Sequence, residues 1–174
     1  FKEIIYNKDL DYFMDSVEKN GISSKVSILF IGKIYAKQRK EKEAEEQFRK
    51  YIEIDKDKTP HARMELGKLY AKQGKEKEAE EQFRKYIEID KDKTPHARLE
   101  LGKLYAKQGK EKEAEEQFKK YIEIDKDKSP HAMLELGMLY EKQGKEKEAE
   151  EQFKKSIDKD KTTYARLKLG KLYV

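Results

Sequence analysis

The chain contains no cysteine and no tryptophan, and it has only three prolines in 174 residues. The lack of cysteine excludes a disulfide scaffold and every metal site that depends on thiolate ligands. Long apolar runs are missing too: the longest, residues 26–35, is interrupted by Ser27, Gly32 and Lys33, so we expect no membrane-spanning helix. No secretory leader follows Phe1, and we expect a cytoplasmic protein that is a piece of a longer chain or a processed product.

A strong charge of one sign is also absent. The chain carries 41 basic and 36 acidic side chains, and the resulting net charge of +5 is far from the dense basic surface of a nucleic-acid-binding protein. Charged residues make up 44% of the sequence, a share that by itself suggests disorder. However, eleven tyrosines and seven phenylalanines recur at regular intervals, which indicates a folded chain with a repeated core.

The sequence does contain one segment that is repeated several times. Residues 59–93 recur as residues 94–128, 35 positions later, with two changes: Met64 becomes Leu99 and Arg84 becomes Lys119. The period divides the chain into an N-terminal helix or partial repeat (1–23), four repeats (24–58, 59–93, 94–128 and 129–161) and a half repeat or C-terminal capping helix (162–174). Recent duplication and consensus design both explain copies this similar.

Each copy predicts two helices. In the second copy, Thr59 is expected to cap the first helix and Pro60 to occupy its first position. Gly74 is expected to end this helix, because glycine readily adopts the left-handed conformation. The apolar residues follow the spacing of one helix face: Ala62, Leu66, Leu69 and Tyr70 in the first helix, and Ala79, Phe83, Tyr86 and Ile87 in the second.

Helices of roughly 12–15 residues are too short to be stable alone in water, so these helices must stack on their neighbours. Glycines inside the first helices indicate close helix approach, and phenylalanines of the second helices are expected beside them. These residues are Gly67, Gly102 and Gly137, with Phe83, Phe118 and Phe153. On the outer face, the spacing of Glu80 with Arg84 and of Glu81 with Lys85 predicts ion pairs.

One set of residues recurs in register: Leu66-Gly67, Tyr70, Gly74, Ala79 and Phe83, with the same residue types 35 and 70 positions later. This set resembles the tetratricopeptide repeat family, over the chain from about Ser24 to the C-terminus. The resemblance implies an all-α fold, a right-handed α-solenoid of antiparallel helix pairs whose first helices line a concave wall. It also implies that a protein or peptide binds in this concave groove.

The chain departs from the family pattern in three ways. Its period is one residue longer, and Arg39 stands where glycine is expected. The bulky aromatic residue early in the first helix is replaced by Arg63, Arg98 and Met133. We expect these changes to alter loop geometry and superhelical pitch rather than the fold.

The candidate binding residues are first-helix residues that point away from the packing stripe. They are His61, Met64, Lys68, Lys72, His96, Leu99, Lys103, Lys107, His131, Leu134, Met138 and Lys142. An apolar row recurs once per repeat at Leu29, Met64, Leu99, Leu134 and Leu167, and it is either exposed to a partner or partly buried against the next helix. If it is exposed, it forms a track flanked by lysines, which suits a helix or an extended segment with acidic and apolar residues.

Catalytic and metal chemistry are not indicated. The three histidines occupy the same position in successive copies, at His61, His96 and His131, and packed helices place such copies about 8–10 Å apart or more. They are therefore too distant to share one metal ion. The sequence has neither a nucleophile elbow nor a phosphate-binding glycine loop. We expect no cofactor, no metal and no enzymatic activity.

The two ends of the chain carry incomplete repeats. Asn7 can cap a helix over residues 8–20, with Leu10, Phe13, Met14 and Val17 on its apolar face. At the other end, Ala165, Leu169, Leu172 and Tyr173 form a first-helix stripe that no second helix follows. An apolar outer face at the end of a solenoid favours end-to-end contact.

Two alternatives to a protein-binding module stay open. The first is an architectural array, natural or designed, that self-associates through its ends and has no dedicated ligand. The second is RNA binding, because the period of 35 residues equals that of the pentatricopeptide family. The helix signatures of that family are absent here, which makes nucleic acid the weaker alternative.

Overall fold

The computed structural model describes residues 25–56, 58–91, 93, 95–126, 130–159 and 163–173, and the regular structure of these residues is helical. The helices are α2 (Lys25–Lys37), α3 (Glu41–Asp55), α4 (His61–Lys72), α5 (Glu76–Asp90), α6 (His96–Lys107), α7 (Glu111–Asp125), α8 (Pro130–Lys142), α9 (Glu146–Lys159) and α10 (Thr163–Leu172). None of the described helices is long and apolar enough to cross a lipid bilayer. The helix expected over residues 8–20 lies outside the described residues.

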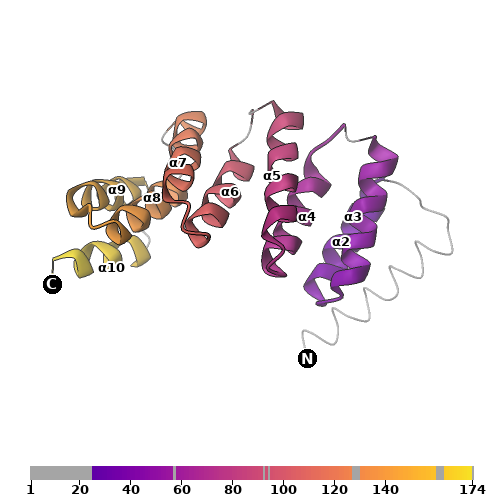
Figure 1. The fold of residues 1–174 in the computed structure, drawn as a ribbon, viewed down its shortest axis with the longest axis horizontal. Helices are drawn as coiled ribbons and strands as arrows, with labels where there is room; N and C mark the ends of the chain where they lie inside the picture. The colour runs from indigo at the N-terminus through magenta and orange to yellow at the C-terminus, as the bar shows by residue number, and fades with distance from the viewer. Residues whose placement is uncertain are drawn as a thin grey trace.

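The helices form an extended array of antiparallel pairs (Figure 1). α2 packs on α3, α4 on α5, α6 on α7 and α8 on α9, and each second helix also contacts the first helix that follows it. First helices of successive pairs contact one another, whereas the second helices of the described pairs stand farther apart. The first helices therefore lie on the inner side of the array. The predicted all-α repeat solenoid is confirmed.

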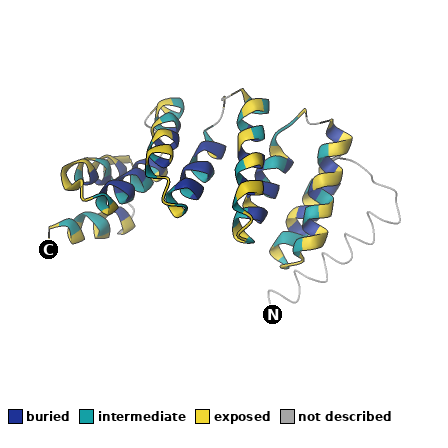
Figure 2. Ribbon diagram, viewed as in Figure 1, coloured by how far each residue is buried: buried dark blue, intermediate teal, exposed yellow. Residues whose placement is uncertain are grey.

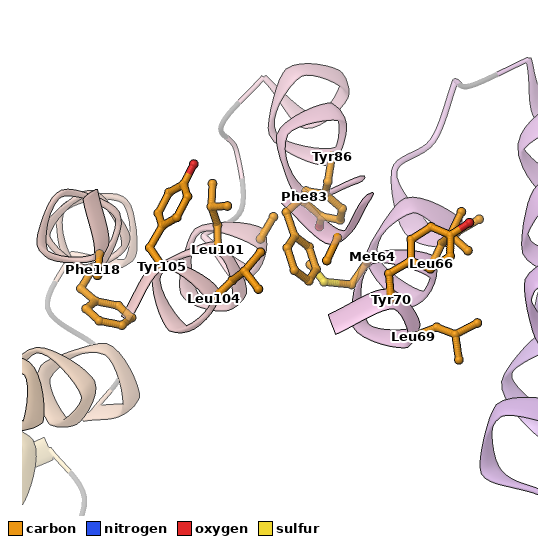
Figure 3. Close-up of a cluster of buried hydrophobic side chains, with 14 of the residues drawn as sticks. Met64, Leu66, Leu69, Tyr70, Phe83, Tyr86, Leu101, Leu104, Tyr105 and Phe118 are labelled. Carbon is orange, nitrogen blue, oxygen red and sulfur yellow. The ribbon is translucent and has the colours of Figure 1, made fainter. Parts of the chain in front are cut away.

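The core is built on a repeated contact between a glycine and a phenylalanine. A Cβ atom added at Gly102 would lie 2.5 Å from Cε1 of Phe118, closer than real Cβ atoms approach. We call this arrangement a glycine notch, and it recurs between Gly32 and Phe48, Gly67 and Phe83, and Gly137 and Phe153. The four phenylalanines are at most 1% exposed and belong to one core cluster of apolar side chains. Figure 2 marks the buried residues along the helices, and Figure 3 shows Phe83 and Phe118 with other buried side chains of the cluster. The close contact predicted for these residues is confirmed.

The first helices end at residues in the left-handed conformation. Gly74, Gly109 and Gly144 have φ values of 75°, 74° and 71°, as expected for glycines that terminate helices. In the first pair the same place is held by Arg39, with a φ of 61°. A residue with a Cβ atom pays roughly 1 kcal/mol for this conformation, because the Cβ lies too close to the backbone carbonyl.

The start of α4 differs from the prediction. Thr59 does not cap this helix; its amide and its hydroxyl both donate to Oδ2 of Asp55, at 2.7 and 2.9 Å. Asp55 is only 1% exposed, and a buried carboxylate must be hydrogen-bonded, which explains why it takes both groups. Pro60 occupies the cap position without a side-chain hydrogen bond. In α8, by contrast, Pro130 is the first helical residue, as predicted.

The expected ion pairs on the second helices are confirmed. Arg84 lies 2.9 Å from Glu80, and Lys85 lies 2.7 Å from Glu81. Tyr105, from the first helix of the next pair, binds both members of the Glu80–Arg84 pair. Its hydroxyl donates to Glu80 at 2.9 Å and accepts from Arg84 at 2.8 Å. This group, here called a tyrosine clasp, therefore ties one repeat to the next.

The clasp recurs between α3 and α4. The hydroxyl of Tyr70 donates to Glu45 at 2.8 Å and accepts from Arg49 at 2.7 Å, and the Lys75 ammonium lies 5.3 Å from the centre of the Tyr70 ring. Burial, together with the hydrogen bond to the Glu45 carboxylate, raises the pKa of Tyr70 from 10.0 to about 12. Tyr140 makes the same bond to Glu115.

The glycine notch predicts the effect of adding one methyl group. Gly102→Ala forces the buried Phe118 ring to move, and we expect a loss of about 1–3 kcal/mol in the free energy of unfolding, although alanine is the better helix former. Gly170→Ala is the matched control, because nothing lies within 4 Å of a Cβ at Gly170, and it should leave stability unchanged or raise it by up to about 1 kcal/mol. Urea denaturation would measure both, and equal effects would contradict the notch.

The strained turn of the first pair predicts a stabilising substitution. Arg39→Gly puts glycine, which adopts positive φ without steric cost, at a position with a φ of 61°. We expect this change to raise the free energy of unfolding by about 0.5–1 kcal/mol. The reverse change, Gly74→Arg, should lower the stability by a similar amount. Thermal or urea unfolding of both variants checks this, and a destabilised Arg39→Gly protein would refute it.

The tyrosine clasp predicts how stability depends on alkaline pH. Between pH 10.0 and about 12 the unfolded chain releases the Tyr70 proton while the folded chain keeps it, so the stability that this group contributes is complete below pH 10.0 and is lost as the pH rises through this range. Tyr70→Phe should cost about 1 kcal/mol at neutral pH and should make the alkaline decline shallower than in the wild type. Urea midpoints measured over this pH range test both effects, and parallel declines would rule out the clasp as their source.

Candidate functional site

The candidate site is the inner wall formed by the first helices α2, α4, α6, α8 and α10. The predicted histidines and most of the predicted lysines are exposed there: His61, His96, His131, Lys68, Lys72, Lys107 and Lys142. Lys103 is half-buried. These polar residues are thus accessible to a partner, as the proposed site requires.

The apolar row does not form a continuous exposed track. Met64 is only 8% exposed and belongs to the core, where Figure 3 shows it beside the buried aromatic and aliphatic side chains. Leu29, Leu99 and Leu134 are half-buried and pack against the same core. Of the two alternatives left open for this row, burial therefore holds at Met64, because its flexible thioether chain fills the space between helices.

The exposed part of the row lies at the C-terminal end of the wall. Leu167 is 53% exposed and Tyr164 is 50% exposed, both on α10. The Tyr164 hydroxyl lies 3.8 Å from Sδ of Met138, which is one helical turn from Leu134 on α8. Leu134, Met138, Tyr164 and Leu167 make up what we call the inner apolar patch.

The lysines of the inner wall make loose ion pairs with acidic residues of the preceding repeat. Lys72 lies 3.8 Å from Glu41, and Lys107 lies 4.0 Å from Glu76. Lys142 repeats the pattern, and the side chains of the three lysines are 58–64% exposed. Exposed pairs at such distances contribute little to stability, so breaking them costs little free energy.

Further pairs join first helices to each other along the wall, among them Lys168 of α10 with Glu141 of α8 at 2.8 Å. Lys33 lies 3.2 Å from Glu65, and Lys103 lies 3.4 Å from Glu135. The inner wall is therefore a ladder of alternating charges rather than a uniformly basic surface.

The histidines stay separate. Within the part of the chain that the structure describes, no three histidine or acidic side chains are placed to hold a metal ion. His61, His96 and His131 are exposed at the starts of successive first helices. Their position on the wall makes them candidate polar contacts for a partner.

A groove on the outer side was not predicted from the sequence. A cavity of about 420 Å³ lies between α5 and α7, with α6 beneath it, and its lining residues are Arg84, Ile87, Glu88, Arg98, Leu101, Tyr105, Glu113, Glu116, Gln117 and Lys120. Arg98 is 8% exposed and donates to Oε1 of Gln117 at 2.7 Å. The signal in the sequence was an arginine where the family has an aromatic residue. Three basic and three acidic residues line the cavity, so its charge selects no class of ligand.

Comparison with known families gives one match. The model of the tetratricopeptide repeat matches residues 27–58, 60–93, 95–128 and 130–162. These four segments cover most of the chain and coincide with the four helix pairs from α2 to α9. No curated protein sequence matches the chain significantly.

Solved structures share the arrangement of the helices. The MamA protein superposes with a TM-score of 0.73 at 21% sequence identity, over 86% of this chain and 80% of MamA. The pilF protein of Pseudomonas aeruginosa gives 0.77 at 20% identity, over 85% of this chain and 67% of that one. YrrB, described as a repeat protein of this type with an unusual peptide-binding site, gives 0.69 at 20% identity, over 92% and 81%. At such low identity the likeness shows the fold alone.

Proposed function

Because the chain belongs to the tetratricopeptide repeat family, we propose that it is a protein-interaction scaffold and that its inner wall binds a segment of another protein. The segment carries acidic and apolar side chains, and the scaffold itself performs no chemistry. The peptide-binding site for which YrrB is described supports a role of this kind for the fold.

The inner apolar patch is the observation that carries this proposal. Tyr164 and Leu167 are half-exposed large side chains on a chain with a mean hydropathy of −1.13, and folding does not require them on the surface. Exposed apolar side chains that gather at one place are typical of interaction sites. An apolar anchor of the partner would lie against Leu167 and Met138.

The surrounding charges define the rest of the partner. Lys107 and Lys142 lie on the same wall as the patch and are held only by loose pairs to Glu76 and Glu111. Acidic side chains next to the apolar anchor would replace these glutamates. The segment binds as an extended strand or as an amphipathic helix, the two forms that grooves of this kind accept.

A panel of peptides selected from a random displayed library tests the site. We expect the selected peptides to combine acidic and apolar residues, and we expect Leu167→Ser to weaken their binding by about tenfold or more, since burial of one leucine contributes about 1.5–3 kcal/mol. Leu167 is 53% exposed, so the variant should fold like the wild type.

Ile54→Ser provides the matched control, because Ile54 is an aliphatic residue, 42% exposed, on the second helix α3. Binding should stay within about twofold of the wild type in this variant. Peptides that bind the Leu167→Ser protein as tightly as the wild type would remove the inner apolar patch from the proposal. Selected peptides that are basic would overturn the charge assignment.

A further inference from the structure

The cavity between α5 and α7, here called the outer cavity, adjoins a position at which the repeats differ. Arg63, Arg98 and Met133 hold this position in three successive first helices. Met133 is a core residue that is 1% exposed, whereas Arg98 lines the cavity and donates to Gln117 at 2.7 Å. Since the tetratricopeptide pattern has a bulky aromatic residue here, the outer cavity adjoins a place that the family fills with an aromatic ring.

The lining of the outer cavity offers a flat cation next to apolar side chains. Ile87 of α5 and Leu101 of α6 belong to the lining together with Arg98. The guanidinium of an arginine is planar and stacks on aromatic rings through its face, whereas its N–H groups donate within its plane. Stacking is therefore compatible with the hydrogen bond from Arg98 to Gln117 and with further bonds that this guanidinium makes in its plane.

The walls of the outer cavity also carry hydrogen-bond acceptors. Glu88 on α5 and Glu113 on α7 line it from the two second helices, and both residues are exposed. Their carboxylates can accept a bond from the indole N–H of tryptophan, a donor that usually finds a partner when its ring is buried. Basic and acidic side chains line the cavity in equal number, so stacking and shape rather than charge distinguish a ligand.

We propose that the outer cavity binds a tryptophan side chain of a partner protein. The ring lies against the Arg98 guanidinium and the apolar side chains of Ile87 and Leu101, and its N–H donates to Glu88 or Glu113. The volume of about 420 Å³ is near the lower end of the range of ligand pockets, about 300–1,000 Å³, and suits one large side chain. Tryptophan is prominent among the residues that anchor protein interfaces in such pockets. This second site lies on the opposite side of the array from the inner wall.

A methyl NMR titration of the 174-residue chain with N-acetyltryptophanamide tests the site. This probe is neutral and carries the tryptophan ring with its N–H donor. We expect the methyl signals of Ile87 and Leu101 to shift until they saturate, while the methyl signals of Leu167 on the inner wall stay in place. N-acetylphenylalaninamide has a ring without this donor, and we expect it to bind about threefold more weakly or worse.

Two substitutions of Arg98 locate the ring. Arg98→Trp puts a ring of the chain itself into the outer cavity, and it should weaken binding of the probe at Leu101 by more than about tenfold. Arg98→Met removes the planar cation and should weaken binding by about threefold or more; methionine is accepted here in the next repeat, at Met133. Arg166→Met is the matched control, because Arg166 takes the same place in α10 and is exposed, and its affinity should stay within about twofold of the wild type. Circular dichroism checks that each variant is folded.

Four results would overturn the proposal. One is a wild-type protein whose Ile87 and Leu101 signals stay unchanged up to the solubility limit of the probe. Another is a folded Arg98→Trp protein whose Leu101 signal still shifts, and a third is a folded Arg98→Met protein that binds the probe as tightly as the wild type. The last is equal affinity for the two probes, which would remove the preference for tryptophan. Methyl shifts confined to Leu167 would place the ring on the inner apolar patch, so they would refute the outer site without contradicting peptide binding by the inner wall.

Discussion

The structure depends on the approach of two helices at a glycine. Helices of 12 and 15 residues, such as α4 and α5, are too short to persist alone in water, so each must bury a face against a neighbour. The glycine removes the side chain that would hold the helices apart, and the phenylalanine ring enters the space. Because the same contact is made in every complete pair, each repeat has the same internal geometry, and a regular array follows from stacking one pair on the next.

Polar contacts between the repeats complement this apolar contact within them. The clasp of Tyr105, Glu80 and Arg84 crosses from a second helix to the next first helix at the edge of the core. The glutamate takes part in a pair along its own helix and in a bond across the repeats, so one side chain couples local and long-range order. A chain in which 44% of residues are charged thereby uses part of its charge to define how neighbouring repeats are oriented.

The sequence could predict two kinds of contact: those between residues close together in the chain, and those that recur at a fixed spacing in every repeat. The pair of Glu80 and Arg84 follows from one turn of helix, and the contact of Gly102 with Phe118 follows from a glycine and an aromatic residue that recur at a fixed spacing. Thr59 was misplaced because two acceptable bonds compete, the cap of α4 and the buried carboxylate of Asp55, and only the burial decides between them.

Features that depend on the packing between repeats could not be predicted. Met64 and Leu99 occupy the same position of the repeat, yet one is in the core and the other is half-buried, since the longer side chain reaches a space that leucine does not. The outer cavity above Arg98 depends on the separation of α5 and α7, which is set by the pitch of the whole array. The exposure of the polar first-helix residues could therefore be predicted, whereas the apolar side chains that remain exposed could not, and that this wall binds a partner stays a prediction.

The position of the inner apolar patch at one end of the wall affects the register in which a ligand would bind along the repeats. Successive repeats offer almost the same groups, so a ligand bound by the lysines and histidines alone could shift by one repeat and find equivalent contacts. The three intervening repeats have a histidine at the place of Tyr164 and a buried or half-buried apolar residue at the place of Leu167, whereas α2 has Val26, which is 76% exposed, at the place of Tyr164. An anchor at this end breaks the translational symmetry of the wall, gives the groove a starting point, and sets the direction in which a bound chain runs.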